Sequence, residues 1–184
     1  MPVQLHLGCG KRHIPGFVHI DLDDFPHIDY RSGIDKLPMF ADEAADLIYC
    51  SHAFEYFDRT QAKGVLAEWH RVLKPGGLLR LAVPDFEALA AAFRKSGNLD
   101  RILGPLYGRI EIHAPDGSRL LYHRTAYDFA SLEKMCLQAG FLSLRRYDWR
   151  QTIHKDYDDH SQAYFPHMDK ERGELISLNV EAMK

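Results

Sequence analysis

The first residues that could do chemistry lie just after a short apolar run near the N-terminus. Residues 3–7 read Val-Gln-Leu-His-Leu and are followed at once by Gly8-Cys9-Gly10. Glycines after a strand let the backbone turn sharply and let a ligand approach the main-chain amides. Asp21 closes the next apolar run, residues 17–20, and a carboxylate there can accept the hydroxyls of a ribose. The pair indicates a nucleoside site, although Asp21 by itself reads equally well as a strand-end cap or turn residue.

Polar residues also follow two later apolar runs. Ser51-His52 comes after residues 46–50, and Pro84-Asp85 comes after residues 78–83. In an open parallel sheet, ligands bind outside the carboxyl ends of the strands, where the strand order reverses. We therefore expect these residues to gather beside the glycine turn and form a site for a nucleoside with a charged amino-acid tail.

Helical patterns alternate with these apolar runs and predict a mainly parallel α/β sheet. The clearest helix has apolar residues on one face between Val65 and Leu73, and the run 74–77, Lys-Pro-Gly-Gly, ends it. A second helix is predicted after Pro84-Asp85. A third follows Asp128, a good N-cap, and stops at Gly140.

The C-terminal half predicts a different arrangement. Residues 109–124 read as a β-hairpin or long loop, because the turn sequence Ala-Pro-Asp-Gly lies at their centre. Residues 141–149 and 174–182 predict the last two strands, and the polar stretch 150–173 between them predicts irregular structure. A weaker apolar run, 27–30, predicts an early strand.

The motifs give the chain a resemblance to class I S-adenosylmethionine (SAM)-dependent methyltransferases. They come in that family's order: Leu5-His6-Leu7-Gly8-Cys9-Gly10, Leu37-Pro38, Asp46-Leu47-Ile48-Tyr49, Arg71-Val72-Leu73-Lys74-Pro75-Gly76-Gly77, and Leu132 through Gly140-Phe141. More narrowly, the chain resembles a small branch of predicted methyltransferases often associated with glycan biosynthesis. The motifs of that branch are Ser51-His52-Ala53-Phe54-Glu55, His123-Arg124-Thr125-Ala126 and Asp159 to Val180.

The resemblance implies a single domain, residues 1–184, with a doubly wound, Rossmann-like α/β fold. Its sheet would have seven mostly parallel strands, helices on both faces and an antiparallel last strand. The implied cofactor is S-adenosyl-L-methionine. The implied reaction is methyl transfer, which we expect to be directed at a hydroxyl of a small-molecule or saccharide acceptor. The alternative is a non-catalytic SAM- or nucleotide-binding module, or a protein-interaction module, on the same scaffold.

The resemblance also implies roles for individual residues. The cofactor pocket would be built around Leu7, Gly8, Cys9 and Gly10, with the last three lining the methionine part of SAM. Asp21 would bind the ribose and Leu22 would pack near the adenine, with Asp35 an approximate substitute for an acidic adenine contact. Ser51 and His52 would face the methyl donor.

The chain departs from the family in its first crossover. Only ten residues separate Gly10 from Asp21, whereas a parallel crossover usually takes about a dozen or more and contains a helix. We therefore predict a shortened crossover that lacks the helix whose N-terminus normally faces the cofactor's carboxylate. Lys11, Arg12 or His13 could supply the missing positive charge. In addition, His6 stands where the family usually has an acidic residue.

Histidines are the candidates for the base that a hydroxyl acceptor needs, because their pKa lies near working pH. His52 is the first catalytic candidate and His123, at the end of the hairpin, is the second. Glu55 reads as a helix cap, and Asp85 as either an acceptor contact or the N-cap of the next helix. Cys9 reads as a small packing residue rather than a nucleophile.

Composition limits the classes of partner. A net charge of -3 over 184 residues offers no basic face for nucleic acid. Three widely spaced cysteines make a disulfide framework unexpected, and no run is long enough for a membrane span, so we expect a cytoplasmic protein. The His- and Asp-rich residues 154–167 match no standard metal motif, so no metal is assigned. A homodimer is left open.

Overall fold

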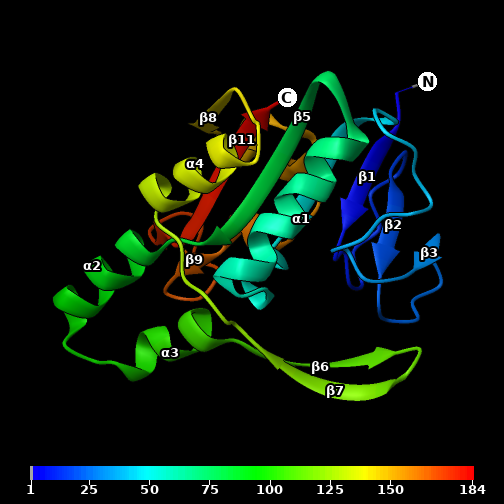
Figure 1. The fold of residues 1–184 in the computed structure, drawn as a ribbon. Coiled ribbons are helices and arrows are strands. Elements are labelled where there is room, and N and C mark those ends of the chain that lie inside the picture. Colours follow the sequence, from blue (N-terminus) through cyan, green and yellow to red (C-terminus); the bar gives the residue numbers. More distant parts are fainter. Residues whose placement is uncertain (1) are drawn as a thin grey trace.

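A seven-stranded sheet runs through residues 2–184, the part of the chain that this computed structural model describes (Figure 1). The strand order is β3-β2-β1-β4-β5-β11-β8, and only β11 runs antiparallel to its neighbours. The predicted fold class is thereby confirmed. The strands are β1 (Gln4–Leu7), β2 (Val18–Asp21), β3 (Tyr30–Arg31), β4 (Ala45–Ser51), β5 (Leu73–Pro84), β8 (Ser143–Arg146) and β11 (Ser177–Met183).

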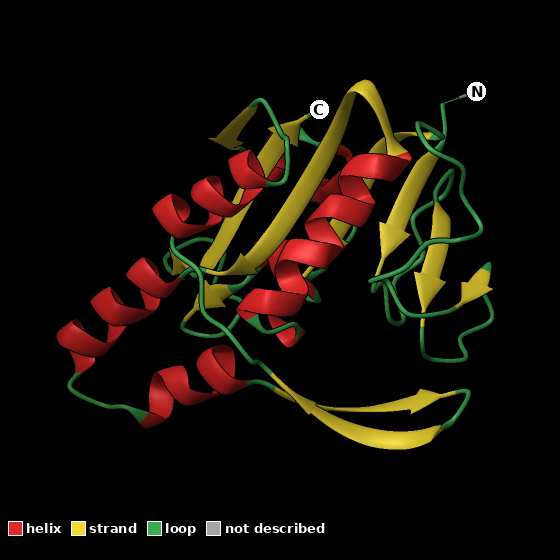
Figure 2. Ribbon diagram, viewed as in Figure 1, coloured by secondary structure: helices red, strands yellow, loops and turns green. Residues whose placement is uncertain are grey.

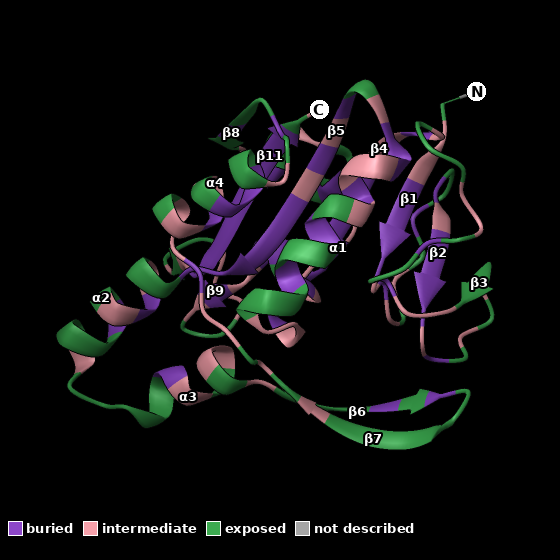
Figure 3. Cartoon of the chain, in the orientation of Figure 1, coloured by how far each residue is buried: buried purple, intermediate pink, exposed green. Residues whose placement is uncertain are grey.

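One face of the sheet carries an apolar core beneath two helices, α1 (Arg59–Val72) and α4 (Phe129–Gln138). Figure 2 shows both helices in front of the sheet, and Figure 3 shows buried residues along β1, β5 and β11. Alternate strand residues meet the helices, as a period of two requires. Trp69 of α1 is fully buried, and its indole nitrogen donates a hydrogen bond to the Ile34 carbonyl at 2.7 Å. The helices α1 and α4 therefore cover this face of the sheet.

Acidic N-caps start the helices where the sequence predicts. Asp128 accepts from the Ser131 amide and begins α4. Asp85 accepts from the Glu87 and Ala88 amides and begins α2 (Phe86–Ser96), so its predicted N-cap role is confirmed. These contacts satisfy amides that have no partner inside the helix.

The hairpin is confirmed as β6 (Arg109–Ala114) and β7 (Gly117–Tyr122), paired in register along their length. A helix before it, α3 (Asp100–Tyr107), was not predicted from the sequence. Gly104 and Pro105 lie inside this short helix and hide its pattern, because both residues normally indicate a break.

Several predicted bounds were wrong. The early strand is Tyr30–Arg31 instead of residues 27–30, and the sixth predicted strand shrinks to Ser143–Arg146. The predicted strand 174–182 divides into β10 (Glu174–Leu175), which pairs with β9 (Tyr164–Phe165), and β11. α1 ends where expected, but the strand after it begins at Leu73.

The opposite face of the sheet is polar, and the irregular C-terminal segment covers it. Residues 149–162 form three short 3-10 helices, η2 (Trp149–Gln151), η3 (Ile153–Asp156) and η4 (His160–Gln162). His154 stacks on Tyr49 of β4 with ring centroids 3.6 Å apart, and the Tyr49 hydroxyl donates to Asp159 at 2.5 Å. Short 3-10 helices cover this face where α-helices were expected, so the expectation of α-helices on both faces was wrong.

The shortened crossover explains why this face needs such a cover. Residues 8–17 connect β1 to β2 as turns without any helix, which confirms the prediction. Ile14 and Phe17 of this connection are buried in a small cluster with Tyr49, against the same face that the C-terminal segment covers. Separately, none of the helices in residues 2–184 has the length and apolar character needed to cross a membrane.

We expect Tyr49→Phe to loosen the C-terminal cover. The substitution removes the donor to Asp159, which is 2% exposed, and leaves a buried carboxylate oxygen without that partner. Such a loss lowers the free energy of unfolding by about 1–3 kcal/mol, measured by urea denaturation. Tyr107→Phe is the control, because Tyr107 is 59% exposed. Equal stability of the two variants would contradict the prediction.

Candidate active site

The glycine turn and Asp21 meet at the carboxyl ends of β1 and β2. Gly8 and Gly10 have φ of +63° and +54°, the left-handed region that glycine adopts without strain. The Gly10 amide donates to Asp21 Oδ2 at 2.7 Å, and the Asp23 amide donates to Asp21 Oδ1 at 2.9 Å. Asp21 therefore holds two main-chain turns together, and each oxygen keeps lone pairs that these amides do not use.

The two glycines differ in what lies against them. A Cβ on Gly8 would come within 2.5 Å of the Ala53 side chain, so the segment after β4 packs directly on this backbone. A Cβ on Gly10 would meet nothing within 4 Å. Of the two, Gly10 is the glycine with open space beside it for a ligand.

The other residues predicted to bind the cofactor differ in how far their side chains are exposed. Leu7 is buried in the core beneath the helices, so its side chain is not available to a ligand. Cys9 is also buried, and burial, then the charge of Asp21, raise the pKa of its thiol, which leaves it unreactive at neutral pH. The Ser51 hydroxyl is buried without a hydrogen-bond partner among residues 2–184. Leu22 is half-buried, and Asp35 is exposed.

Both predicted catalytic histidines face one buried carboxyl group, that of Glu55. His52 Nδ1 lies 3.4 Å from Glu55 Oε1, and His123 Nε2 lies 3.6 Å from the same oxygen. Glu55 is 0% exposed, and neither of its oxygens has a hydrogen-bond partner among the described residues. The sequence analysis did not predict that Glu55 lies between His52 and His123.

The reading of Glu55 as a helix cap was wrong. Glu55 lies inside the 3-10 helix η1 (Phe54–Tyr56), and the N-cap of the following helix α1 is Asp58. The signal that could have revealed its burial is the sequence Phe54-Glu55-Tyr56, which sets the carboxyl group between two aromatic residues.

Burial controls the protonation of this group. Desolvation raises the pKa of Glu55 to about 8, because a charged carboxylate in a dry site loses its hydration. Burial also lowers the pKa of His52 well below its usual value, with smaller contributions from His160, His123 and Arg12. The pKa of His123 is lowered by burial as well. At neutral pH both imidazoles are therefore neutral.

The hairpin crosses the carboxyl edge of the sheet above the glycine turn. Near its tip, the His113 amide donates to Asp23 Oδ1 at 2.7 Å, and Arg31 donates to the His113 carbonyl at 2.5 Å. At its base, the Arg124 amide donates to the Glu55 carbonyl at 2.8 Å. Since β1 lies between β2 and β4 in the sheet, a hairpin tied to both sides passes over the end of β1 (Figure 1).

Of the three basic residues proposed to replace the missing helix, only Arg12 is held beside the site. Its Nε donates to the Asp158 carbonyl at 2.9 Å, and it takes part in no ion pair with residues 2–184. Its charge lowers the pKa of both His52 and His160. Lys11 and His13, in contrast, are exposed.

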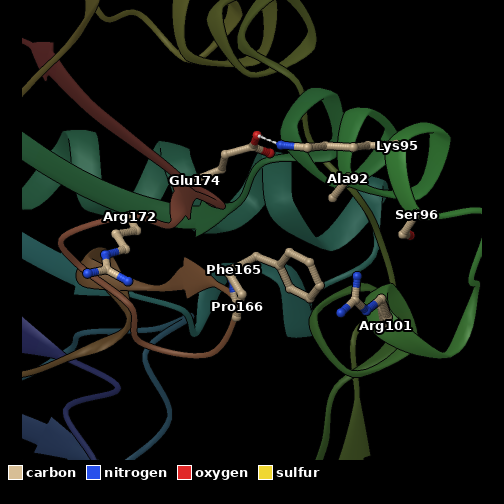
Figure 4. A pocket seen from close by; sticks show the side chains of 8 residues that line it. All are labelled: Ala92, Lys95, Ser96, Arg101, Phe165, Pro166, Arg172 and Glu174. Carbon is tan, nitrogen blue, oxygen red and sulfur yellow. Dashed lines mark hydrogen bonds and ion pairs between the residues drawn. The ribbon is translucent and has the colours of Figure 1, made fainter.

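Two surface hollows lie apart from these residues. One, of about 230 Å³, lies between α2, α3 and the C-terminal segment (Figure 4). Its lining residues are Ala92, Lys95, Ser96, Arg101, Phe165, Pro166, Arg172 and Glu174. The other, of about 450 Å³, lies between α1 and α4. Among residues 2–184, no group of three or more His, Cys, Asp or Glu side chains is arranged to hold a metal ion.

Comparisons with known proteins agree with this fold. Residues 17–81, from β2 into β5, match the family model of the methyltransferase domain. A SAM-dependent methyltransferase from Archaeoglobus fulgidus aligns with 100% of this chain and 86% of its own, at a TM-score of 0.59 and 12% identity. No curated protein sequence matches the chain significantly.

Two further solved structures share the arrangement. One is a 1,6-didemethyltoxoflavin-N1-methyltransferase from Burkholderia thailandensis, solved with 1,6-didemethyltoxoflavin and S-adenosylhomocysteine bound. The alignment covers 100% of this chain and 71% of that protein, at a TM-score of 0.56 and 14% identity. The other is an S-adenosylmethionine-dependent methyltransferase from Mesorhizobium loti, with 99% and 90% of the chains covered, a TM-score of 0.55 and 14% identity. The fold is therefore that of class I methyltransferases.

We expect Gly8→Ala to be more destabilising than Gly10→Ala. Both substitutions place a side chain at positive φ, which costs about 1–2 kcal/mol, but only the first forces a contact with Ala53. That overpacking lowers the free energy of unfolding by about 1–3 kcal/mol more, measured by urea denaturation. The double variant Gly8→Ala/Ala53→Gly should regain part of the loss. Equal losses in the two single variants would show that Ala53 does not press on Gly8.

Proposed function

We propose that this domain binds S-adenosyl-L-methionine at the carboxyl ends of β1, β2 and β4 and transfers its methyl group to a hydroxyl of a small molecule or saccharide. The observation that carries the proposal is the meeting of the Gly8–Gly10 turn with Asp21 beneath the hairpin. The family match over residues 17–81, and a neighbour solved with S-adenosylhomocysteine, support it.

The residues present fit this cofactor. Gly10 has open space beside it, and Asp21 keeps free lone pairs for ribose hydroxyls. Ser51 offers a buried hydroxyl without a partner among the described residues. Leu22 and Asp35 are assigned to the adenine side, as the resemblance implies. Gly8, Cys9 and Leu7 contribute main-chain surface rather than side chains.

Arg12 is assigned to the cofactor's carboxylate. A guanidinium group pairs with a carboxylate through charge-assisted hydrogen bonds, and Arg12 has no acidic partner in residues 2–184. It lies in the crossover where a helix N-terminus would otherwise supply positive charge. In this proposal the charge of the Arg12 side chain takes the place of the positive N-terminus of the absent crossover helix.

The bound cofactor supplies an electrophilic methyl group on a sulfonium, so the protein has to align the acceptor and take up its proton. The acceptor oxygen would take this methyl group and would have to lose its hydroxyl proton. We assign the hydroxyl proton to an imidazole, with His52 the first candidate and His123 the second. Both are neutral at pH 7 and can therefore accept it.

The hairpin is assigned the role of a lid. Its tip is tied to Asp23 and Arg31, and its base to Glu55, so it closes the carboxyl edge on both sides of β1. Ile112 and Ala114 are buried on its inner side, whereas Leu120 and Tyr122 are exposed. Closing such a lid excludes water from a reaction with SAM.

A non-catalytic binding module is the second candidate, because residues 8–17 lack the helix whose N-terminus normally faces the cofactor's carboxylate. Both oxygens of Asp21 already accept main-chain amides, and Ala53 already covers Gly8. These contacts reduce the surface that the turn offers to a cofactor. Binding of SAM without methyl transfer to any hydroxyl acceptor would support this second function.

Titration with SAM and S-adenosylhomocysteine by calorimetry tests the proposal. We expect a dissociation constant on the order of micromolar, lost in Asp21→Ala and weakened roughly tenfold in Arg12→Ala by removal of one charge-assisted contact. Lys11→Ala is the matched control and should bind as the wild type does. No binding by the wild-type protein at millimolar ligand would refute the proposed function.

The lid assignment predicts an effect of Asp23→Ala. Removing the acceptor of the His113 amide frees the hairpin tip, so amides of residues 109–122 should exchange with solvent faster and bound SAM should dissociate faster. Glu111→Gln is the control, because Glu111 is exposed on the same hairpin. Hydrogen exchange and stopped-flow dissociation measure the two effects. Unchanged exchange would mean that this contact does not hold the hairpin closed.

A further inference from the structure

We propose that Glu55 keeps its proton in the working protein and faces the unprotonated nitrogens of His52 and His123 with a neutral carboxyl group, which makes Glu55 a positioning residue for the two rings. The proton assignment follows from the hydrogen-bond partners of the two histidines and from the burial of Glu55. Its bearing on catalysis, that a neutral Glu55 keeps both imidazoles neutral beside the site, rests on the proposed function.

The tautomer of His52 is fixed through a chain of hydrogen bonds that ends at a carbonyl. The Asn179 side-chain amide donates to the Ser161 carbonyl at 2.7 Å, which turns its oxygen toward Ser177. The Ser177 hydroxyl therefore donates to Asn179 at 2.9 Å and has only lone pairs to offer the ring. His52 Nε2, 2.9 Å from the Ser177 oxygen, must be the protonated nitrogen.

The tautomer of His123 follows from its contact with the main chain of α3. Its Nδ1 lies 3.0 Å from the Pro105 carbonyl, which can only accept, so Nδ1 carries the hydrogen. In a neutral ring the other nitrogen, Nε2, then has a lone pair. The ring packs closely on Gly108, where a Cβ would collide with it, and this packing holds the orientation.

Glu55 thus faces two unprotonated nitrogens. His52 Nδ1 and His123 Nε2 both point at Oε1, at 3.4 Å and 3.6 Å. An ionised carboxylate would set its lone pairs against theirs in a fully buried site, whereas a protonated carboxyl group presents a hydrogen to one ring or the other. The raised pKa of Glu55, about 8, agrees with the protonated form at pH 7.

The surroundings of the group supply no counter-charge that would favour ionisation. Besides the two histidines, Glu55 interacts electrostatically with Cys50, Tyr56 and Tyr127, and a charge on Glu55 raises the pKa of each. Arg124 contacts Glu55 through its main-chain amide, while its guanidinium reaches Gln61. His160 and Arg12 lie on the far side of His52 and lower its pKa, which also keeps that ring neutral.

Nitrogen-15 NMR of the imidazole rings tests the proposal without any cofactor. At pH 7 we expect His52 to be protonated only at Nε2 and His123 only at Nδ1. Infrared difference spectroscopy of wild type against Glu55→Gln should show a protonated carboxyl band that the variant lacks. A doubly protonated ring at either position at pH 7, or the absence of that band, would overturn the proposal.

The pH dependence of stability gives a second test, with the sign set by linkage. The pKa of Glu55 is higher folded, about 8, than its ordinary value of 4.5, so its contribution is present in acid and lost as pH rises through 8. Glu55→Gln copies the protonated group and does not titrate. Its melting temperature should match that of the wild type near pH 5 and exceed it by more than about 3 °C near pH 9. A constant difference across this range would contradict the proposal.

The two proposals can fail separately. If SAM does not bind but the tautomers are as stated, the proton site stands and the methyltransferase function falls. If SAM binds and methyl transfer is found, the alkaline change in rate near the pKa of Glu55 should disappear in Glu55→Gln while its KM stays within about twofold. An unchanged pH–rate profile would limit Glu55 to a structural role.

Discussion

The ten-residue connection between β1 and β2 is the constraint on which the rest of this structure depends. It is too short for the crossover helix that would normally cover one face of a parallel sheet. That face therefore has to be covered from elsewhere in the chain, and a positive group has to replace the helix N-terminus at the carboxyl edge. The C-terminal segment provides the cover, and Arg12, the residue proposed for the positive charge, is hydrogen-bonded to that segment.

Covering a sheet with irregular chain changes the kind of interaction that holds the layers together. Irregular backbone leaves many polar groups without regular hydrogen bonds, and this face of the sheet carries polar side chains that can contact them. Glu181 of β11 is 6% exposed and accepts from Arg80 at 2.7 Å and from Arg145 at 2.9 Å, and Arg80 also contacts His154 of the cover. A buried ion pair adds little net stability over an apolar pair, but breaking one is costly. The polar side chains of this face therefore do more to determine which segment covers it than to raise the free energy of unfolding.

The local signals in the sequence predicted much of the fold, because strands, caps and turns depend on neighbouring residues. Asp85 and Asp128 cap helices as expected, and the hairpin forms around its predicted turn. The site was predicted in part, since His52 and His123 were named separately. Their meeting at Glu55 could not be predicted, because it depends on how the hairpin returns to the end of β4. Burial of a charged residue is a property of the tertiary structure.

The same segment that closes the site also sets its protonation. The base of the hairpin brings in His123 and ties Arg124 to the Glu55 carbonyl, so it completes the wall that keeps water from this carboxyl group. The pKa of Glu55 is raised because of that desolvation. Any opening at the hairpin base that admitted water would lower this pKa and release the proton. In the proposed mechanism, closure of the edge and neutrality of the two imidazoles are one event, because the Glu55 proton is stable only while the hairpin base covers it.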